Sequence, residues 1–299
     1  MRVTERTIAS TLLNNLQLGQ TRLDKLQQQA SSGLRISTPG DDPVSAQQVI
    51  QLKGIVKAVD QYARNISTGN AWLEQSDSAM AGMGNVVTRA RELAMQMANG
   101  TYSAQDRTIV ASEMKQLRSE LVQLGNSQVA GRYIFGGFVS DTPPFDPASG
   151  AFIGSGDAVN MEVDRGVYVA INVSGGGLLR GGTPPGSSGT DIIGALDSLT
   201  TALSTNDVSG ISGSLYVLTD AQNQILAARG DVGARMNRVQ SATDKLDTLK
   251  LGLNKVISAK QDVDFLKVMS ELNSQSNAFQ AALSASAKTS QLSLLDYLR

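Results

Sequence analysis

The chain has 299 residues, with 26 basic and 27 acidic side chains and a formal net charge of −1. It contains no histidine and no cysteine. Zinc sites of the Cys/His type, Ser-His and Cys-His nucleophile pairs and thiol redox chemistry are therefore excluded. No basic patch or stripe of the kind that nucleic-acid-binding proteins carry appears along the sequence. Aromatic residues make up only 4% of the chain, and this composition favours helices packed along aliphatic stripes over a large globular core.

The first 30 residues carry small or apolar residues at alternating spacings of three and four. This heptad spacing is typical of a helix that packs along one stripe. Gly33 is a suitable stop for the helix, and "STPG" after it predicts a loop. The stripe comprises Ala9, Leu12, Leu16, Gly19, Leu23, Leu26 and Ala30. We therefore predict a coiled-coil segment at this end.

Two adjacent carboxylates, Asp41 and Asp42, precede Pro43. The pair could bind a metal or act as an acid–base pair, or it could mark the start of a helix. Proline suits the first helical position and holds the residue before it in extended geometry. Asp42 is then a natural N-cap, whose carboxylate accepts hydrogen bonds from N–H groups of the first turn. We predict a structural joint at Gly33, Asp42 and Pro43, and no catalytic, cofactor or metal site.

After the joint, an unbroken apolar stripe predicts one long helix over residues 43–98, ending at Asn99-Gly100 in left-handed geometry. Ser103, with an acidic residue three positions later, has the capping-box arrangement and predicts a third helix. Its apolar stripe runs from Ile109 to Leu124. "GRYIFGGF", residues 131–138, alternates in polarity and predicts a β-hairpin with its turn at Gly136-Gly137.

The composition changes over residues 139–189, where glycine and proline are common. Short alternating runs at residues 161–163 and 167–173 predict a small inserted β-rich domain. "SGGGLLRGG", residues 174–182, lacks the GxxxxGK[ST] pattern of a phosphate loop, so we predict a flexible loop there.

Helical character returns at residue 191 and becomes continuous from about Gly213 to an interruption near Asp262. "RGD" at residues 229–231 falls inside this predicted helix, where it is a poor adhesive loop. "DVDF" at residues 262–265 lacks the glycine and terminal glutamate of an EF-hand, so we predict no calcium site. A final helix carries apolar residues to the C-terminus.

The predicted fold is mainly α, with long antiparallel helices, terminal coiled-coil segments and a small inserted β-rich domain. We divide the chain into a terminal coiled-coil domain (1–40 and 262–299), a long-helix domain with a hairpin (41–138 and 190–261) and the β-rich insertion (139–189). Because the chain returns on itself, its two end segments are expected to lie side by side.

Several motifs resemble the flagellin superfamily of bacterial axial proteins. These are "SSGLRISTPGDDP" near the N-terminus, "NGTYSAQDR", "GRYIFGGFVSDTPPF" and a helical C-terminus ending in "SLLDYLR". The resemblance covers the helical frame and not the middle segment. It implies a non-enzymatic structural protein without cofactors, located outside the cell in the flagellum, and exported by the flagellar type III channel without a cleaved signal peptide.

The same motifs imply a position between the hook, on the side of hook-associated protein 1, and the flagellin filament. Expected partners are these two proteins, further copies of the chain in a ring and an export chaperone, with no nucleic acid and no membrane insertion. The expected subunit-packing residues are Leu12, Leu16, Leu23, Leu26, Leu266, Leu272, Phe279, Leu283, Leu294 and Leu298. We also expect the end segments to become ordered only on assembly.

Two alternatives stay open at this point. The chain could be a flagellin, the bulk subunit of the filament, because flagellins share the joint and the terminal stripes. It could also be a secreted adhesin or enzyme whose activity lies in the glycine-rich middle segment.

Overall fold

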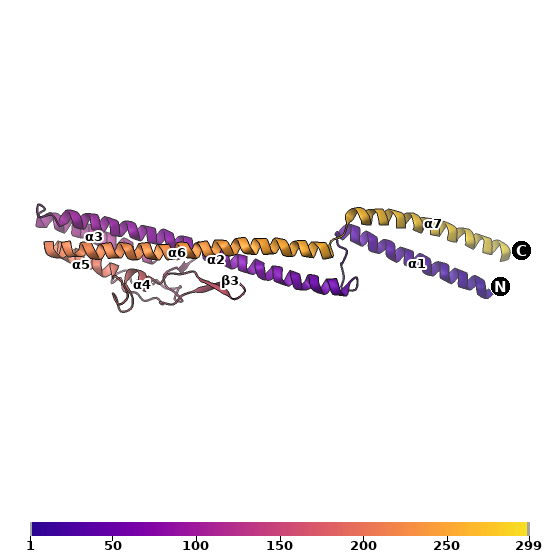
Figure 1. Ribbon diagram of the computed structural model, residues 1–299, viewed down its shortest axis with the longest axis horizontal. Coiled ribbons are helices and arrows are strands. Elements are labelled where there is room, and N and C mark those ends of the chain that lie inside the picture. Colours follow the sequence, from indigo (N-terminus) through magenta and orange to yellow (C-terminus); the bar gives the residue numbers. More distant parts are fainter. Residues whose placement is uncertain (1, 298–299) are drawn as a thin grey trace. The chain divides into compact units, whose positions relative to one another are not determined.

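The computed structural model describes the backbone of residues 2–297 and the side chains of residues 7 and 10–288. Long helices at both ends of the chain enclose a segment of short strands and loops, so the predicted mainly α fold is confirmed (Figure 1). The elements are α1 (Arg2–Ser32), α2 (Pro43–Met97), α3 (Ala104–Gly125), β1 (Gln128–Val129), β2 (Arg132–Tyr133), β3 (Asn160–Asp164), β4 (Val167–Ala170), α4 (Gly175–Leu179), α5 (Ile192–Ser204), α6 (Val208–Gln261) and α7 (Phe265–Tyr297).

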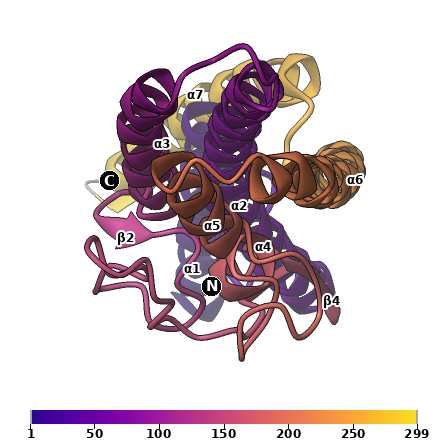
Figure 2. The same cartoon turned by 90° about the vertical axis from the view of Figure 1, so that its left-hand side faces the viewer.

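Helices α2 and α6 run antiparallel. Arg229 of α6 pairs with Asp77 of α2 at 2.8 Å, and Gln222 donates to Thr88 at 3.4 Å. Residue numbers rise along α2 as they fall along α6, as the predicted arrangement of long helices requires. Helices α3 and α5 pack on each other, and Figure 2 shows all four helices end-on. Arg229, the arginine of the "RGD" sequence, therefore belongs to the ion pair with Asp77 that joins α6 to α2.

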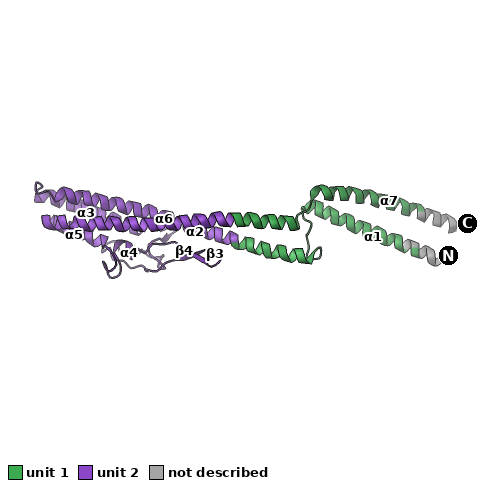
Figure 3. Ribbon diagram, viewed as in Figure 1, with its two compact units in different colours: residues 1–58, 248–299 green, residues 59–247 purple. Residues whose placement is uncertain are grey.

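The chain divides into two compact units (Figure 3). Unit 1 comprises residues 1–58 and 248–299, and unit 2 comprises residues 59–247. The division into three domains remains a prediction, because each unit contains part of the long helices.

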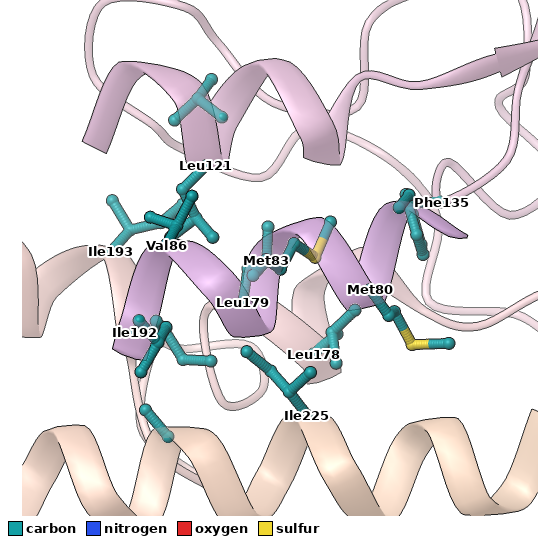
Figure 4. Close-up of a cluster of buried hydrophobic side chains, with 14 of the residues drawn as sticks. Met80, Met83, Val86, Leu121, Phe135, Leu178, Leu179, Ile192, Ile193 and Ile225 are labelled. Atoms are coloured by element: carbon teal, nitrogen blue, oxygen red, sulfur yellow. The ribbon is translucent and has the colours of Figure 1, made fainter. Parts of the chain in front are cut away.

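The core of unit 2 is aliphatic and rich in methionine. Side chains from α2, α3, α4, α5 and α6 converge in it (Figure 4). Its largest fully buried members are Phe135, Phe145, Leu73, Met80, Met83, Met97, Met114, Leu121, Ile134, Leu179, Ile192 and Ile193. Ile109 was expected in the stripe of α3 but is 61% exposed. It lies off the buried face, which carries Arg107, Ala111, Met114, Leu121 and Val122.

The hairpin after α3 has its turn at a different place from the predicted one. Strands β1 and β2 pair through Gln128 with Tyr133, and the turn consists of Ala130 and Gly131, both with positive φ. Two positive φ angles are typical of the type I′ turn, which matches the twist of paired strands. The prediction of a turn at Gly136-Gly137 as part of this hairpin is therefore wrong.

Gly136 and Gly137 instead form a separate tight turn with the next segment. The amide of Val139 donates to Gly136 O at 3.2 Å. Gly137 has φ +62°, and a Cβ at this position would lie 2.4 Å from the carbonyl oxygen of Ser155. The backbone at Ser155 leaves no room for a side chain at position 137. The glycine pair therefore allows residues 136–139 to lie against residue 155.

Helix α2 does not end in left-handed geometry, as was predicted for Asn99-Gly100. Neither residue has a positive φ. The buried guanidinium of Arg107 instead donates to Met97 O at 3.0 Å and to Asn99 O at 2.9 Å. A cation at a helix C-terminus satisfies carbonyls that have no partner within the helix. The arginine thus takes the part that a glycine cap was expected to play.

The capping box of α3 is confirmed. The amide of Asp106 donates to Ser103 Oγ at 3.2 Å, and the amide of Ser103 donates to Asp106 Oδ2 at 3.0 Å. The hydroxyl of Ser103 and, after it, the amide of Ser103 donate to the Asp106 carboxylate and hold the pKa of Asp106 below its ordinary value.

The inserted segment contains less β structure than was predicted. Strands β3 and β4 form one antiparallel hairpin, which three side chains of the long helices hold. Asn65 donates to Glu162 O at 3.1 Å, Arg235 donates to Asn172 O at 2.7 Å, and Lys245 pairs with Asp164 at 2.6 Å. Most of the remaining segment is irregular.

The glycine-rich run at residues 174–182 is only partly the predicted loop. Residues 175–179 form α4, which Ser174 caps by accepting the amide of Gly177. Leu178 and Leu179 are buried in the core. The amide of Gln224 in α6 donates to Leu178 O at 2.7 Å and to Thr190 O at 3.0 Å, which ties this segment to α6.

Candidate assembly surface and joint

Helices α1 and α7 of unit 1 lie side by side and antiparallel, as expected for the two end segments. Gln275 donates to the carbonyl oxygen of Gly19 at 3.4 Å. A Cβ on Gly19 would lie 3.2 Å from the ring of Phe279, so glycine permits the close approach of this aromatic side chain. The glycine of the heptad stripe therefore lies at a point of close contact between the two helices.

The described leucines of the α1 stripe are only half-buried. Leu12, Leu16, Leu23 and Leu26 all keep part of their surface exposed, and no described side chain of α1 is fully buried. Leu13 and Leu18, outside the stripe, are 67% and 56% exposed. Pairing with α7 alone therefore leaves apolar surface of α1 in contact with water.

The predicted packing residues of α7 divide into two groups. Leu272 and Phe279 are half-buried, and the ring of Phe279 lies next to Gly19 of α1. Leu266 and Leu283 are 84% and 46% exposed. Leu294 and Leu298 lie outside the residues whose side chains the structure describes.

Val268, which the sequence analysis did not single out, is the buried apolar residue of the described part of α7. It heads a series with Leu272, Gln275 and Phe279 at spacings of four, three and four. This spacing is the signal that identifies the inward face. Leu266 lies on the opposite side of the helix.

The joint between α1 and α2 includes a segment that the sequence did not point to. Gly33 ends α1 with φ +69°, and its carbonyl oxygen accepts the amide of Val263 at 3.0 Å. The amide of Arg35 donates to Gln261 O at 2.7 Å, and Leu34 forms an isolated antiparallel bridge with Asp262. Residues 33–36 and 261–263 thus form a short antiparallel contact, which ties the two interruptions of the helices together.

Asp42 caps α2. Its Oδ1 accepts the amide of Ser45 at 3.1 Å, and its carbonyl oxygen accepts the amide of Ala46 at 2.9 Å. Pro43 occupies the first position of the helix. Hydrogen bonds from Ser45, and the charge of Arg35 at 3.8 Å, hold the pKa of Asp42 below its ordinary value.

Asp41 has a different role from its neighbour. Its Oδ1 pairs with Lys25 of α1 at 2.8 Å, while its Oδ2 accepts the amides of Ser37 and Thr38 at 3.1 Å each. These partners, with Lys25 the strongest, hold the pKa of Asp41 well below its ordinary value. Asp42 thus starts α2, and Asp41 fastens the loop to α1.

The described residues contain no group of three or more acidic, histidine or cysteine side chains placed to hold a metal ion. No described helix has a stretch both long and apolar enough to cross a lipid bilayer.

Two family models match the chain. The bacterial flagellin N-terminal helical region matches residues 3–140, and the bacterial flagellin C-terminal helical region matches residues 215–298. Together they cover most of the chain and leave out residues 1–2, 141–214 and 299.

Similar proteins extend over nearly the full length. Flagellar hook-associated protein 3 of Escherichia coli is 29% identical over 90% of this chain and 91% of its own length. Flagellin FlaB1 of Treponema pallidum is 28% identical over 99% of this chain and 96% of its own. A solved structure of a putative flagellar hook-associated protein from Vibrio parahaemolyticus superimposes with a TM-score of 0.67 at 23% identity, over 74% of this chain and all of the other. The helical frame, the joint and both family models thus agree, and the chain belongs to the flagellin family of bacterial flagellar proteins.

Proposed function

We propose that the chain is the structural protein that joins the hook of the bacterial flagellum to its filament. The observation that carries this function is the similarity to flagellar hook-associated protein 3, which extends over nine-tenths of both chains. The chain is a non-enzymatic part of the extracellular flagellum. Its role is mechanical. It links the helical lattice of the hook to that of the filament through contacts that join different surfaces of neighbouring subunits.

The terminal pair α1·α7 supplies packing surfaces in this proposal. The stripe leucines Leu12, Leu16, Leu23 and Leu26 are half-buried within one chain, and Leu266 and Leu283 are exposed. Burying such side chains against further subunits is favourable, since each Å² of apolar surface removed from water contributes about 25 cal/mol. Leu294 and Leu298 are proposed to extend the same surface.

We propose further that the terminal pair becomes stably ordered only when these surfaces are covered. A pair of helices with few fully buried side chains does not offset the conformational entropy of ordering two long segments. Hydrogen exchange on the monomer tests this directly. Rapid exchange across residues 5–30 is expected, and strong protection there would contradict the proposal.

The partners we propose are hook-associated protein 1 on the hook side, flagellin on the filament side and further copies of the chain in a ring. Before assembly an export chaperone would hold the terminal segments, and the chain would pass unfolded through the flagellar type III channel. The exposed apolar residues of α7 support a chaperone contact, because such a surface aggregates when left uncovered.

The first alternative is flagellin itself, favoured by the 28% identity to flagellin FlaB1. The copy number of the chain per flagellum separates the two functions, because a filament subunit occupies every site of the filament lattice, on the order of thousands of copies. A junction protein would be present in far fewer copies. The second alternative places an adhesive or enzymatic activity in the middle segment. Deleting residues 140–190 supports this alternative if filaments stay attached while a binding or catalytic activity disappears.

Deleting the gene tests the proposed function. Cells without the chain are expected to carry hooks without filaments and to release flagellin into the medium, because the filament has no surface on which to start. Normal filaments in the deletion strain would contradict the function.

A further inference from the structure

The turn between α2 and α3 contains the one asparagine of the chain that is followed by glycine, in the pair Asn99-Gly100. Asparagine loses its side-chain amide without an enzyme when the backbone nitrogen of the next residue attacks its side-chain carbonyl carbon. Glycine favours this attack because it has no Cβ and the least restricted backbone. A folded chain permits the reaction only where the pair is accessible and the attacking N–H is not engaged in a hydrogen bond.

Both residues of this pair are exposed. A Cβ built on Gly100 would meet nothing within 4 Å, so no neighbouring atom obstructs that side of the residue. The helical hydrogen bonds of α2 end just before it, with the amide of Ala98 donating to Ala94 O at 2.8 Å and the amide of Asn99 donating to Gln96 O at 3.3 Å. The amide of Gly100 has no acceptor among the described residues. The attacking nitrogen is therefore accessible and not engaged.

Arg107 makes the same peptide group more acidic. The carbonyl oxygen of Asn99, which belongs to the peptide group of the Gly100 nitrogen, accepts Nη2 of Arg107 at 2.9 Å. The attacking form of a peptide nitrogen is its anion, whose negative charge is shared with that oxygen. A cation at hydrogen-bond distance favours the anion. Only 3% of Arg107 is exposed, so water screens its charge poorly.

Thr101 activates the carbon under attack. Its amide donates to Oδ1 of Asn99 at 3.2 Å. The attack turns this oxygen into an oxyanion, and a donor that already points at it stabilises the new charge. The same bond folds the carboxamide back along the chain towards Gly100, the residue between the two partners. The turn therefore favours both the attacking nitrogen and the carbon that it attacks.

The pair Asn126-Ser127, which follows α3, is held in the opposite way. The carboxamide of Asn126 donates to Phe145 O and accepts the amide of Phe145, both at 2.9 Å. The amide of Ser127 donates to Leu124 O at 3.2 Å, and Asn126 is half-buried. Both reacting groups are engaged here, so this pair is an internal control for the exposed one.

We propose that Asn99 is a site of spontaneous deamidation in the folded chain. The nitrogen of Gly100 bonds to Cγ of Asn99, and the side-chain nitrogen leaves as ammonia, which takes up the proton that Gly100 loses. The product is a succinimide ring, which water then opens. Opening at the former side-chain carbonyl gives aspartate. Opening at the main-chain carbonyl gives isoaspartate, in which the backbone continues through the former side chain.

Arg107 also influences which product forms. In isoaspartate, the former main-chain carbonyl of residue 99 is a free carboxylate, in the place where Nη2 of Arg107 donates to a neutral oxygen before the reaction. An arginine binds a carboxylate more strongly than a neutral carbonyl, so isoaspartate is favoured. Either product adds one negative charge beside the cation that joins the end of α2 to Asn206 in the turn before α6. The chain therefore changes at this point as it ages.

Purified full-length protein is incubated at mildly alkaline pH, and peptide mapping by mass spectrometry follows each asparagine. Asn99 is expected to react within about threefold of the rate in a synthetic peptide of residues 95–104, because the two hydrogen bonds offset the restraint of the fold. Asn126 is expected to react at least about tenfold more slowly than Asn99, because its carboxamide and the next amide are engaged. The ratio of isoaspartate to aspartate should be higher in the folded chain than in the peptide, which lacks Arg107.

Gly100→Ala is the matched variant, because the new Cβ meets open space and φ is not in the left-handed region. Deamidation is expected to slow at least about tenfold in it, and isoelectric focusing should show acidic species accumulating in the wild type alone. The inference is overturned if folded Asn99 reacts more than about threefold slower than the peptide, or if Asn126 or the variant keeps pace with it. An equal product ratio in chain and peptide would also overturn it. Because these measurements need no flagellum, they do not depend on the proposed function.

Discussion

Arg107 donates from Nη1 to Oδ1 of Asn206 at 2.5 Å, across 99 residues of sequence. The same guanidinium donates to Met97 O and Asn99 O, so one side chain connects the end of α2, the start of α3 and the turn between α5 and α6. Only 3% of Arg107 is exposed. At this end of unit 2, one buried cation therefore holds helices that the chain order separates.

Replacing Arg107 with methionine is expected to destabilise unit 2 by about 2–4 kcal/mol, because two carbonyl oxygens and the amide oxygen of Asn206 lose a charged donor. Chemical denaturation followed by circular dichroism measures this. Arg132→Met, at an exposed position of β2, is the matched control. Equal stability of the two variants would show that the connection contributes nothing.

Gly137→Ala is expected to destabilise unit 2, because φ is +62° and the new Cβ would lie 2.4 Å from Ser155 O. The backbone conformation alone costs about 1–2 kcal/mol for an L-residue, and the clash adds to it. Gly156→Ala provides the control, since its φ is not in the left-handed region and its nearest neighbour is a flexible hydroxyl 3.8 Å away. Thermal melts that shift equally for both variants would contradict the prediction.

The pH dependence of the joint follows from Asp41. Its pKa in the folded chain lies below the ordinary 3.8 because Lys25, Thr38 and Ser37 stabilise the carboxylate. A lowered folded pKa means that the carboxylate stabilises the joint fully above the ordinary value, and that this contribution is lost as the pH falls from there towards the folded pKa.

Asp41→Asn is therefore expected to loosen the joint near neutral pH, measured as faster proteolysis of residues 33–42. The difference from wild type should shrink as the pH falls below the ordinary carboxyl pKa, as followed by hydrogen exchange, which remains measurable in acid. Asp24→Asn, at an exposed position on α1 next to Lys25, is the control. A difference that persists unchanged into acid would exclude Asp41 as its source.

Leu16→Asp combined with Leu23→Asp is expected to abolish filament attachment while leaving the melting of unit 2 unchanged, because both leucines belong to the terminal pair in unit 1. Motility of complemented cells and the thermal melt of the purified chain are the two readouts. Gln17→Asp with Asp24→Asn changes exposed positions of the same helix and should leave motility intact. Normal filaments in cells that carry both leucine substitutions would show that Leu16 and Leu23 of α1 do not belong to the packing surface between subunits.

The helices could be predicted from sequence because their stripes are long and regular. The third helix was located by a local rule, the capping box at Ser103, which depends only on residues three apart. The two features of the joint that sequence alone missed depend on distant residues. Gly33 and Val263 meet only after the chain has returned on itself. The ion pair by which Asp41 holds the loop to Lys25 of α1 likewise forms only in the folded chain.

Two local predictions were wrong because a residue outside the motif decides the backbone conformation. Asn99-Gly100 is a good left-handed stop by composition, yet Arg107 satisfies the helix end and no positive φ is needed. The glycines at 136 and 137 were assigned to the hairpin because paired glycines often form its turn. They serve the close approach of Ser155, which no spacing in the sequence reveals.

Immunoelectron microscopy of isolated flagella with an epitope inserted at residues 185–188, which form an exposed loop, distinguishes a junction protein from a filament subunit. For a junction protein, label is expected only at the boundary between hook and filament. Label distributed along the whole filament would contradict it and identify the chain as the filament subunit.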